Sequence, residues 1–179
     1  MGERAADDAA VVSAQIGRLS RADGDVISRC HLGLPVVVRM PPLLDDGTPF
    51  PTRYWLTCPL AVLRIDRLEG IGGVSHMQKR VEADPGARDR LDAAHRRYAA
   101  DRDAALPAGM ERRPTGGVAG IEGRGVKCLH AHYADHRAGH DNPVGEAVAP
   151  WVEPLDCAVL CVVASAGGAT RNPDWSEPR

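Results

Sequence analysis

The sequence predicts an α+β fold: a single domain in which a small, mostly antiparallel sheet is packed by four to six helices. Three observations lead to this prediction. β-Branched residues are concentrated in residues 26–57, helical patterns dominate most of the remaining chain, and the elements lack the alternating order of a parallel sheet. With 179 residues, 44% of them hydrophobic, the chain is long enough to bury one core.

The chain is expected to have three regions. Residues 1–22 form an N-terminal helix or extension, because "DDAAVVSAQIGRL" places apolar side chains at helical spacing behind acidic residues. Residues 23–163 form the α+β domain. Residues 164–179, "ASAGGATRNPDWSEPR", are rich in small and polar residues and are predicted to be a disordered tail.

The sheet is expected in the first half of the domain. "DVISRCHLGLPVVVRM" holds two β-branched runs around a Gly-Leu-Pro break and therefore predicts two strands. A proline-rich loop over residues 41–51 separates them from a short apolar element that ends at Cys58. One more strand is expected near residues 118–127 or 157–163.

The helices are predicted from their end signals and periodicity. Thr57 or Cys58 can cap a helix whose first residue is Pro59, and Gly70 then ends it. Two further helices are expected over residues 74–83 and 86–106, and the glycine-rich residues 114–126 are expected to form a flexible loop or a short strand pair. The last two helices are expected in residues 128–139 and from Pro143, with Asn142 as the N-cap.

Charge and composition disfavour several classes of partner. The formal net charge of -2 and the pI near 6.4 predict that the protein binds neither nucleic acid nor a membrane surface. No apolar run is long enough to span a bilayer, and the acidic N-terminus is unlike a secretory signal. A cytoplasmic protein that acts on a small molecule or another protein is therefore expected, and its five cysteines are expected to be unpaired.

The stretch "GVKCLHAHYADHRAGHDNPVGE" holds four of the seven histidines. If the helix begins at or before Cys128, then His132 lies on the same face four residues later, whereas His130 points away. If Cys128 instead ends a strand or loop, His130 can take that place. We favour the first arrangement because the segment has good helix formers and no breaker before Gly139.

The cysteines differ in their expected surroundings. Cys58 at a helix N-terminus is expected to favour the thiolate, the form that binds metals and attacks electrophiles. Cys157 and Cys161 lie in the apolar run "DCAVLCVVA" and are expected to be core residues.

Three motifs together resemble the bacterial family known as domain of unknown function 501: "RCHLGLPVVVRMPP", "DGTPFPTRYWLTCPLAVLRIDRLEG" and "KCLHAHYADHRAGHDNPVGE". The resemblance covers about residues 26–161 and implies no established activity. It implies a cysteine in each motif and a histidine pair, which are matched here by Cys30, Cys58, Cys128, His130 and His132. The resemblance also suggests gene neighbours for septum formation and polyphosphate breakdown.

The motif residues supply the ligands of a Cys₃His metal site, and Cys30, Cys58, Cys128 and His132 are the predicted ligands. Zinc is the expected ion, an iron–sulfur cluster is the alternative, and three thiols without any ion remain a third interpretation. Further residues of the motifs are candidate ligands or substrate contacts: His130, Arg53, Lys127, Asn142, Asp66 and Glu69.

Two other functions are consistent with the same residues. One is a thiol enzyme in which Cys58 or Cys128 is the nucleophile and His130 or His132 is the base. The other is a non-enzymatic interaction module that serves cell division or polyphosphate metabolism.

Overall fold

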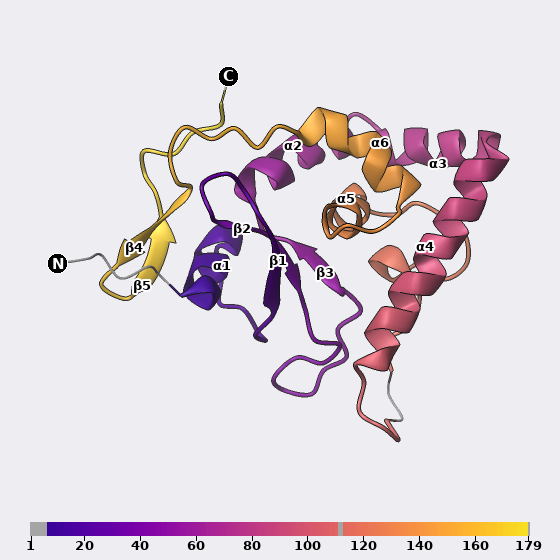
Figure 1. Ribbon diagram of the computed structural model, residues 1–179, viewed down its shortest axis with the longest axis horizontal. Helices are drawn as coiled ribbons and strands as arrows, with labels where there is room; N and C mark the ends of the chain where they lie inside the picture. Colours follow the sequence, from indigo (N-terminus) through magenta and orange to yellow (C-terminus); the bar gives the residue numbers. More distant parts are fainter. Residues whose placement is uncertain (1–6, 111–112, 179) are drawn as a thin grey trace.

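The computed structural model describes residues 7–110 and 113–178, and it confirms a single α+β domain with helices and small antiparallel sheets (Figure 1). Within these ranges the elements are α1 (Asp8–Ile16), β1 (Asp25–Arg29), β2 (Pro35–Arg39), β3 (Tyr54–Leu56), α2 (Pro59–Gly70), α3 (Gly73–Ala83), α4 (Pro85–Ala104), the 3₁₀ turn η1 (Val118–Gly120), α5 (Leu129–Arg137), α6 (Pro143–Val152), β4 (Val162–Ser165) and β5 (Gly168–Arg171).

Strand β2 is the centre of the three-stranded sheet, with β1 and β3 antiparallel on its two sides. Val38 pairs with Val26 of β1 and with Trp55 of β3. Successive side chains of a strand point to opposite faces. Accordingly, Val37 belongs to the main core, whereas Val38 packs with Val12 of α1. The sheet is therefore covered on both faces, which explains why the predicted valine run is almost wholly apolar.

Helix α5 lies in the middle of the molecule and is seen nearly end-on in Figure 1, between β3 and α4 and beside α6. Its side chains Leu129, His132, Tyr133 and Asp135 are all almost completely buried. This helix, although it carries several polar side chains, is thus largely enclosed. Its polar groups must consequently find partners inside the protein.

The helix boundaries follow the predicted end signals closely. Helix α2 begins at Pro59 and ends at Gly70, with Cys58 in the extended N-cap conformation. Helix α6 begins at Pro143, and the side chain of Asn142 accepts hydrogen bonds from the N–H groups of Val144 (3.2 Å) and Gly145 (3.0 Å). The Asn142 cap satisfies backbone donors that a helix leaves unpaired at its start, whereas the side chain of Cys58 makes no cap hydrogen bond.

The C-terminal segment differs from the disordered tail predicted from residue 164. Residues 162–171 instead form the antiparallel hairpin β4–β5, which packs against α1 at the left of Figure 1. Its Val162 packs with Val11, so the hairpin covers an apolar side of α1 that would otherwise face water. Farther along, Glu177 pairs with Arg67 of α2 at 2.5 Å. The small polar residues that suggested disorder here build a tight hairpin.

The glycine-rich segment 114–126 forms a loop around η1, and two buried side chains of α4 anchor it. Arg102, which is 2% exposed, donates to the carbonyl oxygens of Thr115 (3.2 Å) and Gly116 (2.6 Å). His95 accepts from the N–H of Val118 through Nδ1 (3.1 Å) and bonds the carbonyl oxygen of Gly125 through Nε2 (3.0 Å). Both ring nitrogens of His95 are therefore used in holding the loop.

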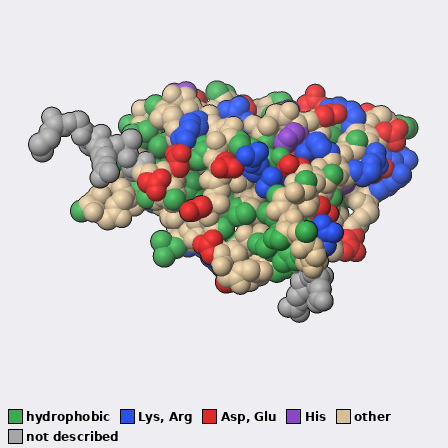
Figure 2. Space-filling view, turned by 60° about the horizontal axis from the view of Figure 1, so that its bottom comes forward, with side chains coloured by type: hydrophobic (Ala, Val, Ile, Leu, Met, Phe, Trp, Pro, Cys, Tyr) green, Lys and Arg blue, Asp and Glu red, His purple; other side chains and the backbone are tan. Residues whose placement is uncertain are grey.

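The surface carries interspersed charge on the face shown in Figure 2, with basic side chains gathered at the end occupied by α3 and α4. No helix in the described part of the chain has the length and apolar character needed to cross a membrane. All five cysteines are free thiols.

The crossing of α6 over α5 yields a prediction for Gly145. An added Cβ there would lie 2.3 Å from the carbonyl oxygen of His132, a backbone atom that cannot rotate away. Gly145→Ala is expected to lower the free energy of unfolding by about 1–3 kcal/mol, measured by urea denaturation. The control is Gly70→Ala, since nothing lies within 4 Å of its added Cβ, and it is expected to be neutral or to stabilise by up to about 1 kcal/mol. Equal losses in both variants would contradict close packing at this crossing.

Candidate functional site

Three potential ligand groups meet where the end of α2 contacts the start of α5. A carboxylate oxygen of Glu69, the sulfur of Cys128 and a ring nitrogen of His130 all lie within 4.8 Å of one another, and all three residues are half-buried. Glu69 lies in the last turn of α2, whereas Cys128 and His130 flank the first residue of α5. The group therefore lies between the end of α2 and the start of α5.

The residue at which α5 begins determines that His130, rather than His132, lies next to Cys128. Helix α5 begins at Leu129, and Cys128 has an extended conformation (φ -142°, ψ 116°) as the N-cap. The favoured prediction that the helix begins at or before Cys128 is wrong, and the alternative arrangement is the one observed. The reason is the carboxylate of Glu69, which accepts the N–H of Leu129 at 2.6 Å and so satisfies a free donor at the helix start. The Cys128 sulfur then lies 3.7 Å from Nδ1 of His130.

The two ring nitrogens of His130 face different groups. Nδ1 lies 3.3 Å from Glu69 Oε1, on the side of Cys128, whereas Nε2 lies 3.2 Å from Asp66 Oδ1. Burial lowers the pKa of His130, but the hydrogen bond and charge of Cys128 and the charges of Glu69 and Asp66 outweigh it and raise the pKa to about 9. At neutral pH a protonated His130 is thus the cation that balances the neighbouring carboxylates.

The donor set is chemically suited to a metal ion. Carboxylate oxygen, thiolate sulfur and imidazole nitrogen are all common ligands of transition metals. Ligating histidines usually direct their second nitrogen to a carboxylate, and Asp66 occupies that place beside His130. The group offers three half-buried protein ligands, one fewer than an enclosed structural zinc site usually has.

His132, the predicted histidine ligand, lies elsewhere. It is fully buried, and its Nδ1 lies 3.2 Å from Oδ1 of Asn142. Because that oxygen already accepts two backbone N–H groups, Nδ1 is the donor, and Nε2 is left without a partner among the described residues. Burial, together with the neighbouring His95, lowers the pKa of His132 to about 4. His132 is therefore a neutral structural residue of the α5–α6 crossing.

Cys30 and Cys58 also lie outside the group. Cys30 is in the β1–β2 turn, where its N–H bonds the carbonyl oxygen of Leu34 (3.0 Å). Cys58 caps α2 as predicted, but it is only 5% exposed, and burial raises its pKa to about 12 even though the N–H groups at the helix start lower it. The predicted thiolate at Cys58 is thus corrected to a neutral thiol, because desolvation exceeds the effect of the helix dipole.

Cys161 and Cys30 both lie near Cys58, and both raise its pKa. Cys161 is buried as predicted, whereas Cys157 is only half-buried and accepts the indole N–H of Trp175 at 3.3 Å. These thiols belong to the packing between the sheet, α2 and the C-terminal segment.

The remaining candidates from the sequence have other roles or are exposed. Arg53 is held by Asp101 (2.8 Å) and by the carbonyl oxygen of Met40 (2.8 Å), so its guanidinium stabilises the loop before β3. Lys127 is exposed next to Cys128. Asn142 is the N-cap of α6 and a partner of Asp135, which explains its position without a ligand.

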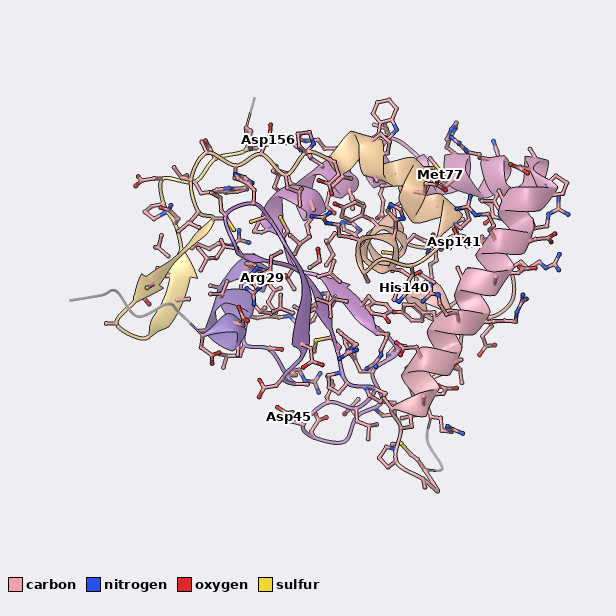
Figure 3. All side chains as sticks on the ribbon, in the orientation of Figure 1. Arg29, Asp45, Met77, His140, Asp141 and Asp156 are labelled. Atoms are coloured by element: carbon pink, nitrogen blue, oxygen red, sulfur yellow. The ribbon has the colours of Figure 1, made fainter. Side chains whose placement is uncertain are left out.

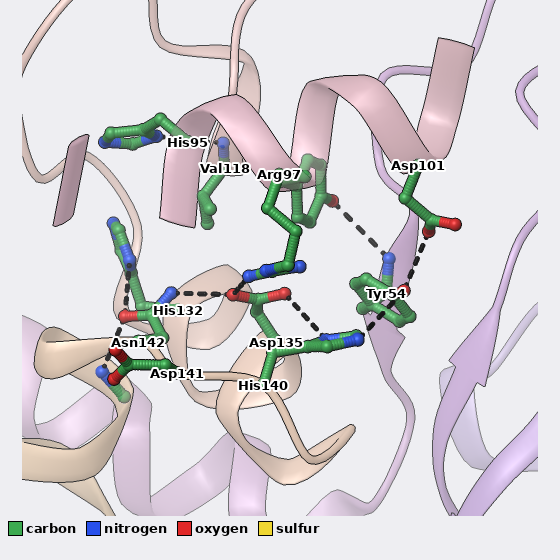
Figure 4. A network of polar contacts seen from close by, with 12 residues as sticks. Tyr54, His95, Arg97, Asp101, Val118, His132, Asp135, His140, Asp141 and Asn142 are labelled. Carbon is green, nitrogen blue, oxygen red and sulfur yellow. Dashed lines mark hydrogen bonds and ion pairs between the residues drawn. The ribbon is translucent and has the colours of Figure 1, made fainter. Parts of the chain in front are cut away.

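A buried polar network lies beyond the group, at the C-terminal end of α5 (Figure 4). The carboxylate of Asp135 is completely buried and accepts from Arg97 (2.5 Å) and from Asn142 (2.9 Å). His140, in the loop after α5 (Figure 3), places Nδ1 3.2 Å from the same carboxylate and Nε2 3.5 Å from the hydroxyl of Tyr54. This network joins α4, α5, α6 and β3, and its members are mostly tied to one another.

Sequence reasoning placed Glu69 and Asp66 only among possible contacts, although both proved to surround His130. The sequence did contain a pattern that points to them. Both lie in the motif after Cys58, three residues apart on one helix, so that they share a face. What the sequence could not supply is that this face meets the start of α5.

Fold and site together define a single-domain α+β protein with a candidate metal-binding group between two helix ends. The chain belongs to the family described as "Protein of unknown function (DUF501)", whose model matches residues 26–150. No curated protein and no solved structure matches the chain. All the residues of the candidate group lie within the matched range, whereas α1 and the β4–β5 hairpin lie outside it.

The buried, neutral His132 predicts a pH dependence of stability. Between pH 6.5 and about 4 the unfolded chain binds a proton at this residue and the folded protein does not, so stability falls as the pH falls through this window. The lowered pKa corresponds to about 3 kcal/mol, present above pH 6.5 and lost by about pH 4.

Urea denaturation of wild type and His132→Asn at several pH values measures this contribution, since asparagine keeps an N–H donor toward Asn142. The variant is expected to lose about 3 kcal/mol less than the wild type over the same window. His31→Asn, at an exposed position, is the control and should follow the wild type. Parallel profiles for wild type and His132→Asn would contradict a neutral His132.

Proposed function

We propose that the protein is a metal-dependent protein whose ion, zinc, is bound by Glu69, Cys128 and His130. The observation that supports this proposal most directly is the approach of three different ligand atoms within 4.8 Å of one another. Asp66 beside the second nitrogen of His130 adds to it, because it would orient the imidazole toward the ion. Zinc suits the mixed oxygen, nitrogen and sulfur donors better than the harder magnesium or calcium ions do.

The number and exposure of the ligands favour an enzyme over a purely structural site. Structural zinc is usually enclosed by four protein ligands, whereas catalytic zinc has three and an open position. In such a site zinc polarises a substrate oxygen or lowers the pKa of a bound water. The chain would position two of the ligands: Glu69 is held by its bond to the N–H of Leu129, and Asp66 lies 3.2 Å from Nε2 of His130.

A thiol enzyme is the second candidate, with Cys128 as nucleophile, His130 as the base that takes the thiol proton and remains charged beside the thiolate, and Asp66 as the orienting carboxylate. The sulfur lies 3.7 Å from Nδ1 of His130, and Nε2 of the same ring lies 3.2 Å from Asp66. In thiol enzymes a cysteine is activated by an adjacent histidine, which is itself oriented by a third group, and these three residues lie in that order. Glu69 favours the metal proposal instead, because a carboxylate next to the sulfur disfavours an unbalanced thiolate.

We further propose that the protein acts in the cytoplasm on a small molecule or another protein. Its five free thiols support a reducing compartment, and its mixed surface charge supports a partner other than nucleic acid or membrane. A role as an interaction module near cell division or polyphosphate metabolism rests on the family resemblance alone.

The metal proposal predicts one zinc per chain in protein purified without chelator, measured by elemental analysis. Cys128→Ser, Glu69→Gln and His130→Gln are expected to abolish zinc retention, and Asp66→Asn to weaken affinity about 10- to 100-fold in a competition titration. Removal of zinc by a chelator should lower the melting temperature by a few degrees, since the ion binds only the folded chain.

Three matched variants are expected to retain zinc: Cys58→Ser, Cys157→Ser and His132→Asn. The first and third also test the ligands first predicted from the sequence. Loss of zinc in Cys58→Ser together with full retention in Glu69→Gln would contradict the proposed group.

Alkylation distinguishes the two candidates. In chelator-treated protein, iodoacetamide is expected to label half-buried Cys128 before Cys58, whose sulfur is buried and whose pKa is about 12. Saturating zinc should slow labelling of Cys128 about tenfold or more, because a ligated sulfur is unavailable, and mass spectrometry of peptides gives the rates. Rapid labelling that zinc leaves unchanged would favour the thiol enzyme.

A further inference from the structure

A cleft of about 480 Å³ opens between α1, the β3–α2 junction and the C-terminal segment. Its volume lies in the range of small-molecule sites. The side chains that give it chemical character are Gln15, Arg18, Trp55, Asp66, Arg171 and Trp175. Gln15, Arg18, Arg171 and Trp175 come from segments outside the range matched by the family model.

Gln15 provides an acceptor that nothing in the described chain uses. The side chain is 3% exposed, and its Nε2 donates to the carbonyl oxygen of Pro35 at 2.9 Å. Because a carbonyl can only accept, this contact determines which end of the amide is the nitrogen. Oε1 of Gln15 is consequently a buried acceptor without a partner among the described residues, and leaving it so is costly. A ligand with an N–H or O–H donor would satisfy it.

The walls of the cleft combine aromatic rings and cations. The guanidinium of Arg18 lies 5.3 Å from the centre of the Trp55 ring, which holds this otherwise exposed side chain at the cleft. Trp175 is anchored through its indole N–H, which donates to the sulfur of Cys157. Arg171 also lines the cleft, and it donates to the backbone carbonyl oxygen of Gln15 at 2.5 Å. Two arginines against one aspartate give these lining groups a net positive charge.

Asp66 connects the cleft to the candidate metal group. Its carboxylate lines the cleft and also lies 3.2 Å from Nε2 of His130. A carboxylate at the edge of a nucleotide site commonly accepts the hydroxyl groups of a ribose.

We propose that this cleft binds a nucleoside monophosphate. The base packs on Trp175 and donates an N–H to Oε1 of Gln15, the ribose hydroxyls donate to Asp66, and the phosphate pairs with Arg18 and Arg171. The proposal of a nucleotide-binding site is supported by the features of the cleft alone. Only its role as the substrate site of the metal group rests on the function proposed above.

Isothermal titration of the full chain with AMP, adenosine and inorganic phosphate tests the proposal. AMP is expected to bind with a Kd between about 1 μM and 1 mM, adenosine at least about tenfold more weakly, and phosphate alone not measurably. Arg18→Gln should weaken AMP about tenfold without changing the affinity for adenosine, because it removes a phosphate contact only. Trp175→Ala should weaken both ligands.

The control is Arg21→Gln, an exposed arginine that pairs with Asp46 outside the cleft lining, and it should bind AMP like the wild type. Absence of AMP binding up to about 10 mM would overturn the proposal. Equal weakening by Arg18→Gln and Arg21→Gln would also overturn it, since it would show only general attraction of an anion.

Cys128→Ser separates this proposal from the preceding one. The variant should lose zinc and yet bind AMP unchanged, because Cys128 does not line the cleft. Retention of zinc in Cys128→Ser would contradict the metal proposal alone, and loss of AMP binding in the same variant would contradict the cleft as an independent site.

Discussion

The completely buried carboxylate of Asp135 is the constraint on which the arrangement of helices depends. A charge removed from water is tolerated only where partners replace the lost hydration. Arg97 of α4 and Asn142 at the start of α6 provide hydrogen bonds at 2.5 and 2.9 Å, and His140 approaches from the loop between α5 and α6. These partners come from different segments, so the polar residues of α5 dictate which elements surround it. Asn142 also caps α6, and one amide thereby fixes both the helix start and its position against α5.

The other end of α5 is also held through a carboxylate, but this one comes from outside the helix. Glu69 accepts the N–H of Leu129, and this bond joins the end of α2 to the start of α5. With both ends of a short, buried helix restrained, the positions of Cys128 and His130 are determined by the packing of the core. A preorganised group of this kind is what metal binding or catalysis requires, because little ordering remains to be done when a ligand arrives.

The candidate group and the cleft have different origins in the chain. The residues of the group all lie in the part that matches the family model, on helix ends restrained by the core. The cleft is completed by α1 and the C-terminal segment, which lie outside that part and pack mainly against each other and the sheet. Asp66 belongs to both. A shared carboxylate would allow a molecule bound in the cleft to influence the orientation of His130.

The sequence by itself determined the local structure well. Pro59 and Pro143 marked helix starts, Gly70 marked a helix end, and the valine run around Pro35 indicated the central strand, because these signals act through backbone conformation within a few residues. It also indicated Cys128 as a ligand, although it favoured His132 over His130 beside it. Which histidine joins Cys128, whether Cys58 is ionised, and whether the C-terminal segment is ordered were decided by tertiary structure. Each depends on a contact across the chain: Glu69 against the start of α5, burial around Cys58, and α1 beneath the hairpin. Such contacts carry no local signal, since desolvation and packing energies arise only when distant segments meet.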